Sequence, residues 1–135
     1  MMRTGVNVDQ LSPAALAYVG DAVYTLHVRT GLVTAGSRPQ SEMHRLASQD
    51  VRAASQARWL TLLEADLLPA EKDVVRWARN ARIGKGGGGT PAERHHATAF
   101  EALLGHLFLS GQSTRLQELL DRLEQLAIPA PELGG

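Results

Sequence analysis

Two stretches of the chain consist almost entirely of small and apolar residues, yet each contains a single carboxylate. ALAYVGDAVYTLHVR at 15–29 contains Asp21, and ATAFEALLGHLFL at 97–109 contains Glu101. Helices that are apolar on nearly all sides are typical of the centre of a helical bundle, where small residues allow close approach. A buried ionised carboxylate is costly unless it is paired or binds a metal ion. The two acids are therefore candidate functional residues.

The first half of the chain reads as helical, with no period-2 strand pattern and no internal repeat. Ser12 before Pro13 predicts the start of a helix that ends before Gly31. Pro39 opens a second helical region that extends to about residue 64. Polar residues at 48–50 interrupt its apolar pattern and indicate a break into two helices.

The second half shows clearer helix boundaries. Pro69 begins a helix that runs to about residue 79 or 80. Thr90 and Glu93 form a capping box around Pro91, so a helix starts there and extends to Gly111. Ser113 caps a last amphipathic helix. About six helices in an all-α domain are expected.

The length of 135 residues indicates one domain. We expect an N-terminal extension at 1–10, the domain at 11–128 and a disordered tail at 129–135. The chain has no cysteine, which excludes disulfides and thiolate metal sites. No apolar run approaches the ~18 residues that cross a membrane, and no signal segment is visible at the start. The sequence therefore predicts a soluble, cytoplasmic protein with no membrane partner.

The net charge of zero argues against a general nucleic-acid coat, but the charges are unevenly distributed. One stretch contains a single acid, Glu93, among these basic residues and histidines: Arg76, Arg79, Arg82, Lys85, Arg94, His95 and His96. Four consecutive glycines at 86–89 disfavour a helix, so 82–90 is predicted to be a flexible, basic, glycine-rich loop. The stretch is either an anion-binding surface or a solvated face.

Two explanations for Asp21 and Glu101 remain open from the residues alone. Each acid could pair with one of the many arginines. Alternatively, the two could meet and share a divalent cation. Mg²⁺ typically takes one or two protein carboxylates and keeps several waters, and the small residues beside both acids leave room for it.

Both acidic segments resemble motifs of one enzyme family. YVGDAVY at 18–24 resembles the signature helix of the ribonuclease III nuclease domain, and FEALLG at 100–105 resembles that family's second acidic helix. The more specific resemblance, over residues 11–127, is to the small bacterial branch called Mini-ribonuclease III. It extends to the segments His-Arg-Leu-Ala at 44–47 and Arg-Asn-Ala at 79–81.

This resemblance implies a homodimeric helical bundle of the ribonuclease III endonuclease-domain type. It implies cleavage of double-stranded RNA with Mg²⁺, for which Mn²⁺ could substitute, leaving 5′-phosphate and 3′-hydroxyl ends. Asp21 and Glu101 would bind the metal and be the catalytic residues. The expected substrate is a precursor of 23S ribosomal RNA, and a ribosomal protein is a possible further partner.

The chain departs from the family pattern at three places. Larger ribonuclease III enzymes have a glutamate and an aspartate where this chain has Ala17 and Thr98, and both changes are typical of the Mini branch. Mini enzymes tend to have Tyr-Arg where this chain has Arg94 and His95. The missing acids leave open whether one or two metal ions bind.

The chain shows no separate RNA-binding domain, so the nuclease domain itself must hold the duplex, mainly through phosphates and 2′-hydroxyls. The candidate RNA-binding residues are Arg45, Arg76, Arg79, Asn80, Arg82, Lys85, Arg94 and His95. For the glycine-rich loop the alternative is a linker that touches nothing, and for Arg45 it is an intrachain salt bridge. Two other functions compete with the enzyme: a catalytically weak RNA-binding or ribosome-associated module, and a helical dimerisation adaptor with structural acids.

Overall fold

The computed structural model describes residues 6–50, 53–81 and 89–127. All regular structure in these ranges is helical, which confirms the predicted all-α class. The elements are η1 (Val8–Gln10), α1 (Pro13–Ala35), α2 (Gln40–Asp50), α3 (Ala53–Leu63), η2 (Glu64–Asp66), α4 (Pro69–Arg79), α5 (Pro91–Leu109) and α6 (Ser113–Ala127).

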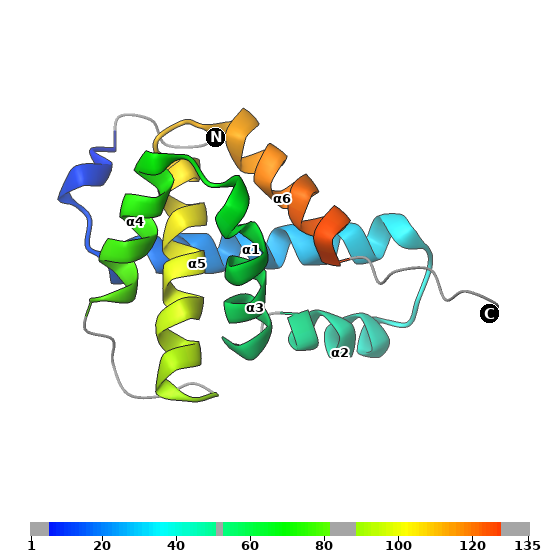
Figure 1. Ribbon diagram of the computed structural model, residues 1–135. Helices are drawn as coiled ribbons and strands as arrows, with labels where there is room; N and C mark the ends of the chain where they lie inside the picture. The colour runs from blue at the N-terminus through cyan, green and yellow to red at the C-terminus, as the bar shows by residue number, and fades with distance from the viewer. Residues whose placement is uncertain (1–5, 51–52, 82–88, 128–135) are drawn as a thin grey trace.

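Helix α5 is the centre of the bundle. It packs most extensively against α1, and also against α3 and α4. Figure 1 shows α3 and α4 on either side of α5, with the long α1 crossing behind them. The second half of α1 extends past this crossing and packs against α2. The prediction that the segment around Glu101 forms a central helix is confirmed, since eight residues of α5 are buried.

The capping residues predicted from the sequence begin their helices. The Ser12 hydroxyl accepts a hydrogen bond from the Ala15 amide at 3.1 Å. The Thr90 hydroxyl accepts one from the Glu93 amide at 3.1 Å, and the Glu93 carboxylate accepts one from the Thr90 amide at 2.8 Å. Helix α5 is thereby fixed at the end that follows the glycine-rich segment.

Two predicted helix ends are wrong. Helix α1 continues through Gly31 to Ala35 and is followed by Gly36, whose φ of 149° is unfavourable for other residues. A single glycine costs a helix about 1 kcal/mol, and the packing of Leu32 against the core offsets that cost. Helix α5 ends at Leu109 rather than at Gly111. The predicted break into two helices is confirmed, because α2 ends at Asp50 and α3 begins at Ala53.

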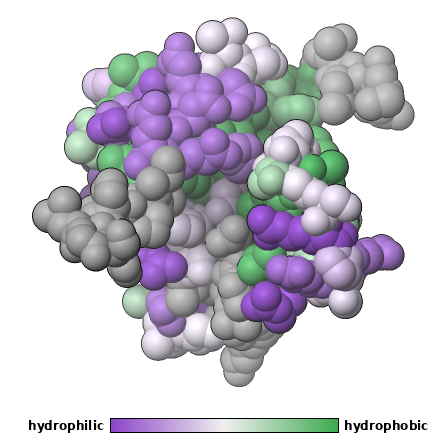
Figure 2. Space-filling model, turned by 90° about the vertical axis from the view of Figure 1, so that its right-hand side faces the viewer, coloured by the Kyte–Doolittle hydropathy of each residue, from purple (hydrophilic) through white to green (hydrophobic). Residues whose placement is uncertain are grey.

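The core is closed on one side by the amphipathic helix α6. Its leucines at 116, 119, 120 and 123 are buried, whereas most of its polar residues are exposed. Figure 2 shows hydrophilic residues gathered over the upper part of one face, at the height where Figure 1 shows α6. None of the helices in the described ranges is long and apolar enough to span a bilayer.

A buried ion pair joins the start of α4 to α6. The Glu71 carboxylate accepts hydrogen bonds from Arg115 Nε at 2.8 Å and Arg115 Nη2 at 2.9 Å, and from the Leu68 amide at 2.8 Å. Arg115 also donates to the Asp66 carbonyl at 2.7 Å. Burial opposes ionisation of Glu71, but these hydrogen bonds outweigh it and lower the pKa of this carboxyl. The pair fixes α4 relative to α6.

Candidate active site

Helices α1 and α5 approach so closely that their backbones are in contact. A methyl group added at Gly20 would lie 2.6 Å from the carbonyl carbon of Glu101 and 2.9 Å from the amide nitrogen of Gly105. A methyl group added at Gly105 would lie 2.8 Å from the carbonyl carbon of Leu16. Carbon atoms normally approach to about 3.5–4.0 Å, so only glycine fits at both positions. The two glycines determine how close the neighbouring side chains come.

The crossing brings Asp21 and Glu101 together. Asp21 directly follows Gly20 on α1, and Glu101 lies one turn before Gly105 on α5. The two carboxyl groups are within hydrogen-bonding reach of each other. Burial and the adjacent Asp21 carboxyl raise the pKa of Glu101 to about 8. The pair is therefore a crowded, partly desolvated site of negative charge.

Asp21 is exposed, and neither Asp21 nor Glu101 pairs with an arginine in the described ranges. The interpretation of Asp21 as buried is wrong, because its side chain is exposed and lies at the edge of the buried face of α1. The alternative in which each acid pairs with an arginine finds no support in the described ranges, where no salt bridge of Asp21 or Glu101 occurs. Each acid has the other as its neighbour instead.

The chemistry of this donor set fits a hard divalent cation. Two carboxylates lie close together, one of them has a raised pKa, and no described residue forms a salt bridge with either; a bound Mg²⁺ would supply a compensating charge. No group of three or more acidic or histidine side chains with metal-site geometry occurs in the described part of the chain. Asp21 and Glu101 would therefore hold a cation that keeps most of its coordination as water or substrate oxygen.

Three candidate RNA-binding residues lie where α4 and α5 approach each other. His95 Nδ1 donates a hydrogen bond to the carbonyl oxygen of Arg79 at 2.9 Å, because a carbonyl can only accept. Arg94 Nη1 donates to the carbonyl oxygen of Gly89 at 2.7 Å. His95 thus joins the last turn of α4 to the first turns of α5. The other two loop candidates, Arg82 and Lys85, lie outside the described residues.

Arg76 and Arg79 line a hollow of about 250 Å³ beside α4. The hollow also contains Lys72, which sequence reasoning missed although its spacing from the two arginines puts all three on one helix face. Asn80 follows α4 and is exposed.

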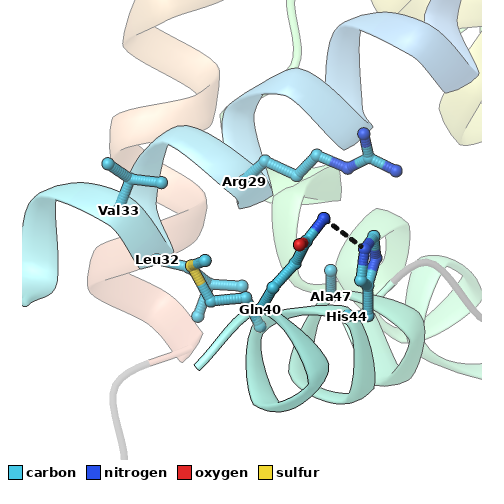
Figure 3. A pocket seen from close by; sticks show the side chains of 7 residues that line it. Arg29, Leu32, Val33, Gln40, His44 and Ala47 are labelled. Carbon is cyan, nitrogen blue, oxygen red and sulfur yellow. Dashed lines mark hydrogen bonds between the residues drawn. The ribbon is translucent and has the colours of Figure 1, made fainter. Parts of the chain in front are cut away.

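Arg45 lies apart from these residues, on α2. Figure 3 shows the neighbouring hollow between α1 and α2, where Arg29 reaches toward Gln40 and His44. The Gln40 amide nitrogen and His44 Nε2 are 3.4 Å apart. Arg45 is exposed, does not line this hollow, and forms no salt bridge with any described residue. The alternative of an intrachain salt bridge of Arg45 thus finds no support in the described ranges.

The chain matches the family model described as "Ribonuclease III domain" over residues 14–112. This range includes both acids and the helix crossing that joins them. The chain therefore belongs to the ribonuclease III family and is an endoribonuclease.

Within that family it belongs to the Mini-ribonuclease 3 branch. It is 38% identical over 121 residues to Mini-ribonuclease 3 of Thermoanaerobacter sp. (strain X514), covering 89% of this chain and 85% of that protein. It is 45% identical over 111 residues to Mini-ribonuclease 3 of Symbiobacterium thermophilum, covering 82% of this chain and 85% of that protein. The resemblance found in the two acidic motifs is confirmed.

The fold is also similar to a solved structure. A crystal structure of a protein from Fusobacterium nucleatum superposes with a TM-score of 0.79 at 21% sequence identity, covering 90% of this chain and 99% of that one. At this identity the match concerns the fold alone. It supports the predicted helical-bundle architecture.

Proposed function

We propose that this endoribonuclease cuts double-stranded RNA in a Mg²⁺-dependent reaction, with Asp21 and Glu101 as its metal-binding and catalytic residues. The observation that carries the proposal is their meeting at the glycine-lined crossing of α1 and α5. The ribonuclease III family acts on double-stranded RNA and generally depends on divalent metals. A precursor of 23S ribosomal RNA is the proposed substrate, with a ribosomal protein as a candidate partner.

The two acids have distinct environments, which suits the chemistry of the site. Asp21 is exposed and can approach the substrate, whereas Glu101 is more buried and its pKa is raised to about 8. Both must be ionised to hold Mg²⁺, so metal binding and loss of the Glu101 proton are coupled. When bound, Mg²⁺ supplies a water nucleophile at neutral pH and stabilises negative charge on phosphate oxygens. Mn²⁺ has similar ligand preferences and should substitute.

The proposed RNA contacts come from cationic and polar side chains of α2, α4 and α5, and from the segment between α4 and α5. In the described ranges they are Arg45, Arg76, Arg79, Asn80, Arg94 and His95, and the proposed set also includes Arg82 and Lys85. Duplex RNA is recognised mainly through its shape, phosphates and 2′-hydroxyls, which such side chains can contact without reading a sequence.

A homodimer is proposed from an exposed apolar stripe on α1. Tyr18, Leu26 and Val33 are 83%, 64% and 63% exposed and follow one face of the helix. Large exposed apolar residues that gather on one face can mark an interaction surface. A two-fold dimer through this face would present two acid pairs, one for each RNA strand. Light scattering should then give the mass of a dimer for the wild type and a lower mass for Leu26→Glu. A monomeric mass for the wild type would exclude the dimer.

The function is tested by incubating the protein with a structured RNA duplex in Mg²⁺ or in EDTA. Cleavage products with 5′-phosphate ends are expected with Mg²⁺ only. Asp21→Asn and Glu101→Gln should each abolish cleavage while the protein stays folded, as judged by circular dichroism. Asp121→Asn is the matched control, because this exposed acid lies on α6 and hydrogen-bonds only to Gln117 among the described residues.

Two results would contradict the proposal. Cleavage that persists in Asp21→Asn would remove the acid pair from the mechanism. Binding of the duplex without cleavage by the wild type, at any divalent metal concentration, would contradict the proposed reaction on this substrate.

A further inference from the structure

Helix α4 carries a row of three cations on one flank, here called the basic row: Lys72, Arg76 and Arg79. Their spacing of four and three residues brings them onto successive turns of one face. They line a hollow of about 250 Å³ together with Glu64, whereas Leu67 and Val75 form its apolar part. Three cations against one acid give this basic groove a positive field.

The basic row is largely uncompensated by the part of the chain that the structure describes. Arg76 has an exposed ion pair with Asp73 at 3.3 Å, and surface pairs of this kind contribute little. Lys72 and Arg79 form no salt bridge with any residue in the described ranges. Lys72 also lies near the start of α4, where the helix dipole disfavours a cation. Like charges one turn apart repel, so the arrangement is unfavourable unless an anion binds.

The basic row lies on the flank of α4 that is turned away from α1. The opposite flank, which carries Val74 and Trp77, borders Leu16 of α1 in a separate hollow. The line of α4 between the two flanks, at Val75 and Ala78, is buried. None of the residues that line the basic groove belongs to α1 or α5, which carry Asp21 and Glu101, so the groove and the acid pair are bordered by different elements.

We propose that the basic groove binds the phosphate backbone of RNA at a place separate from the cleavage site. This inference rests on the proposed function and divides the cations proposed to contact RNA into two groups. The basic row contacts RNA that flanks the scissile duplex, whereas the residues at the start of α5 contact the duplex that is cut. The spacing of the cations by one helical turn, about 5 to 6 Å, suits successive phosphates of a nucleic-acid strand.

The test uses Lys72→Gln, the charge-opposite variant Glu64→Gln, and Asp121→Asn as a control for net charge alone. Binding is measured in EDTA, so that no RNA is cut, to a minimal duplex and to the same duplex with flanking stems. For the longer RNA, Lys72→Gln should weaken binding severalfold and lower the salt slope by about 0.9, the value for one lost phosphate contact. Glu64→Gln should strengthen binding to the longer RNA. Neither variant should alter the affinity for the minimal duplex. Asp121→Asn should alter the affinity for neither RNA.

Equal losses on both RNAs for Lys72→Gln would overturn the inference, because the groove would then belong to the cleavage surface. Unchanged binding to both RNAs would also overturn it, because the basic row would then be a solvated face. Failure of the proposed function is distinguishable: an RNA that binds but is never cut in Mg²⁺ contradicts the reaction and leaves the binding comparison intact. Circular dichroism melting of each variant confirms that it is folded.

Discussion

The close crossing of α1 and α5 makes a sharp prediction about two glycines on one helix. A methyl group at Gly20 would lie 2.6 Å from the Glu101 carbonyl carbon, whereas one at Gly31 would meet nothing within 4 Å. The Glu101 carbonyl oxygen would lie closer still, so the two helices would have to move apart by more than about 1 Å to restore a normal separation of about 3.5 Å. The obstructing atoms belong to the backbone, so no side-chain rotation can relieve the clash.

The expected free energies follow from these two environments. Overpacking of a core typically costs 1–3 kcal/mol, and a rigid backbone contact should be at the upper end, so Gly20→Ala is expected to destabilise by about 3 kcal/mol. Gly31→Ala should stabilise by about 0.5–1 kcal/mol, because alanine favours the helix. The measurement is urea unfolding followed by circular dichroism, with a parallel melt. For a chain of this size, 3 kcal/mol corresponds to a melting temperature lower by about 10 °C.

The reasoning would be refuted if Gly20→Ala were as stable as Gly31→Ala. Equal stability would mean that the helices can separate without loss, and the crossing could then not hold the acid pair at a fixed distance.

Three further predictions concern the titration of Glu101, the ion pair of Arg115 with Glu71, and the hydrogen bond that joins α4 to α5. The pKa of Glu101 is raised from 4.5 to about 8 in the folded protein. Its contribution to stability is therefore full at low pH and is lost as the pH rises through about 8. Between about pH 4.5 and pH 8, the free energy of unfolding of the metal-free protein should fall by at most about 1.4 kcal/mol per pH unit. The fall with pH, measured by urea unfolding, should be smaller for Glu101→Gln. Arg115→Ala should destabilise by about 3–5 kcal/mol, because it leaves the buried Glu71 charge unpaired. The exposed ion pair of Arg122 with Asp66 should contribute under about 1 kcal/mol, so Arg122→Ala should destabilise much less than Arg115→Ala. Equal losses of stability in the two variants would contradict the assigned burial of the Glu71 pair. His95→Ala should cost about 1 kcal/mol and His95→Asn less, since the Asn amide can still donate; equal chemical-denaturation curves would exclude this hydrogen bond.

Much of the fold follows from local signals in the sequence. The capping residues Ser12 and Thr90 with Glu93 determine helix starts through contacts only three residues away, so they were predicted correctly. The end of α1 was not, because a single glycine is a weak stop when tertiary packing favours continuation. The pairing of Glu71 with Arg115 was also beyond the sequence, because it joins residues 44 positions apart with no local pattern.

The candidate site was predictable in part. Small residues beside Asp21 and Glu101 indicated a close approach of two helices, and the structure brings the acids together. The exposure of Asp21 was missed, because a helix that is apolar on nearly all sides gives no indication of which side lies at the surface. The exposed Tyr18, Leu26 and Val33 show that the described part of the chain leaves part of this apolar surface uncovered. The hydrogen bond of His95 to a backbone carbonyl leaves no trace in a side-chain pattern.

The central claim is that Asp21 and Glu101 together bind a divalent cation. It is tested most directly by calorimetric titration of the protein with Mg²⁺ at pH 7, in two buffers that differ in ionisation enthalpy. Because the pKa of Glu101 is about 8, binding should release close to one proton per site. Asp21→Asn should lose both the binding and the proton release. Mg²⁺ binding of unchanged affinity in Asp21→Asn, or binding that releases no proton in the wild type, would contradict the account.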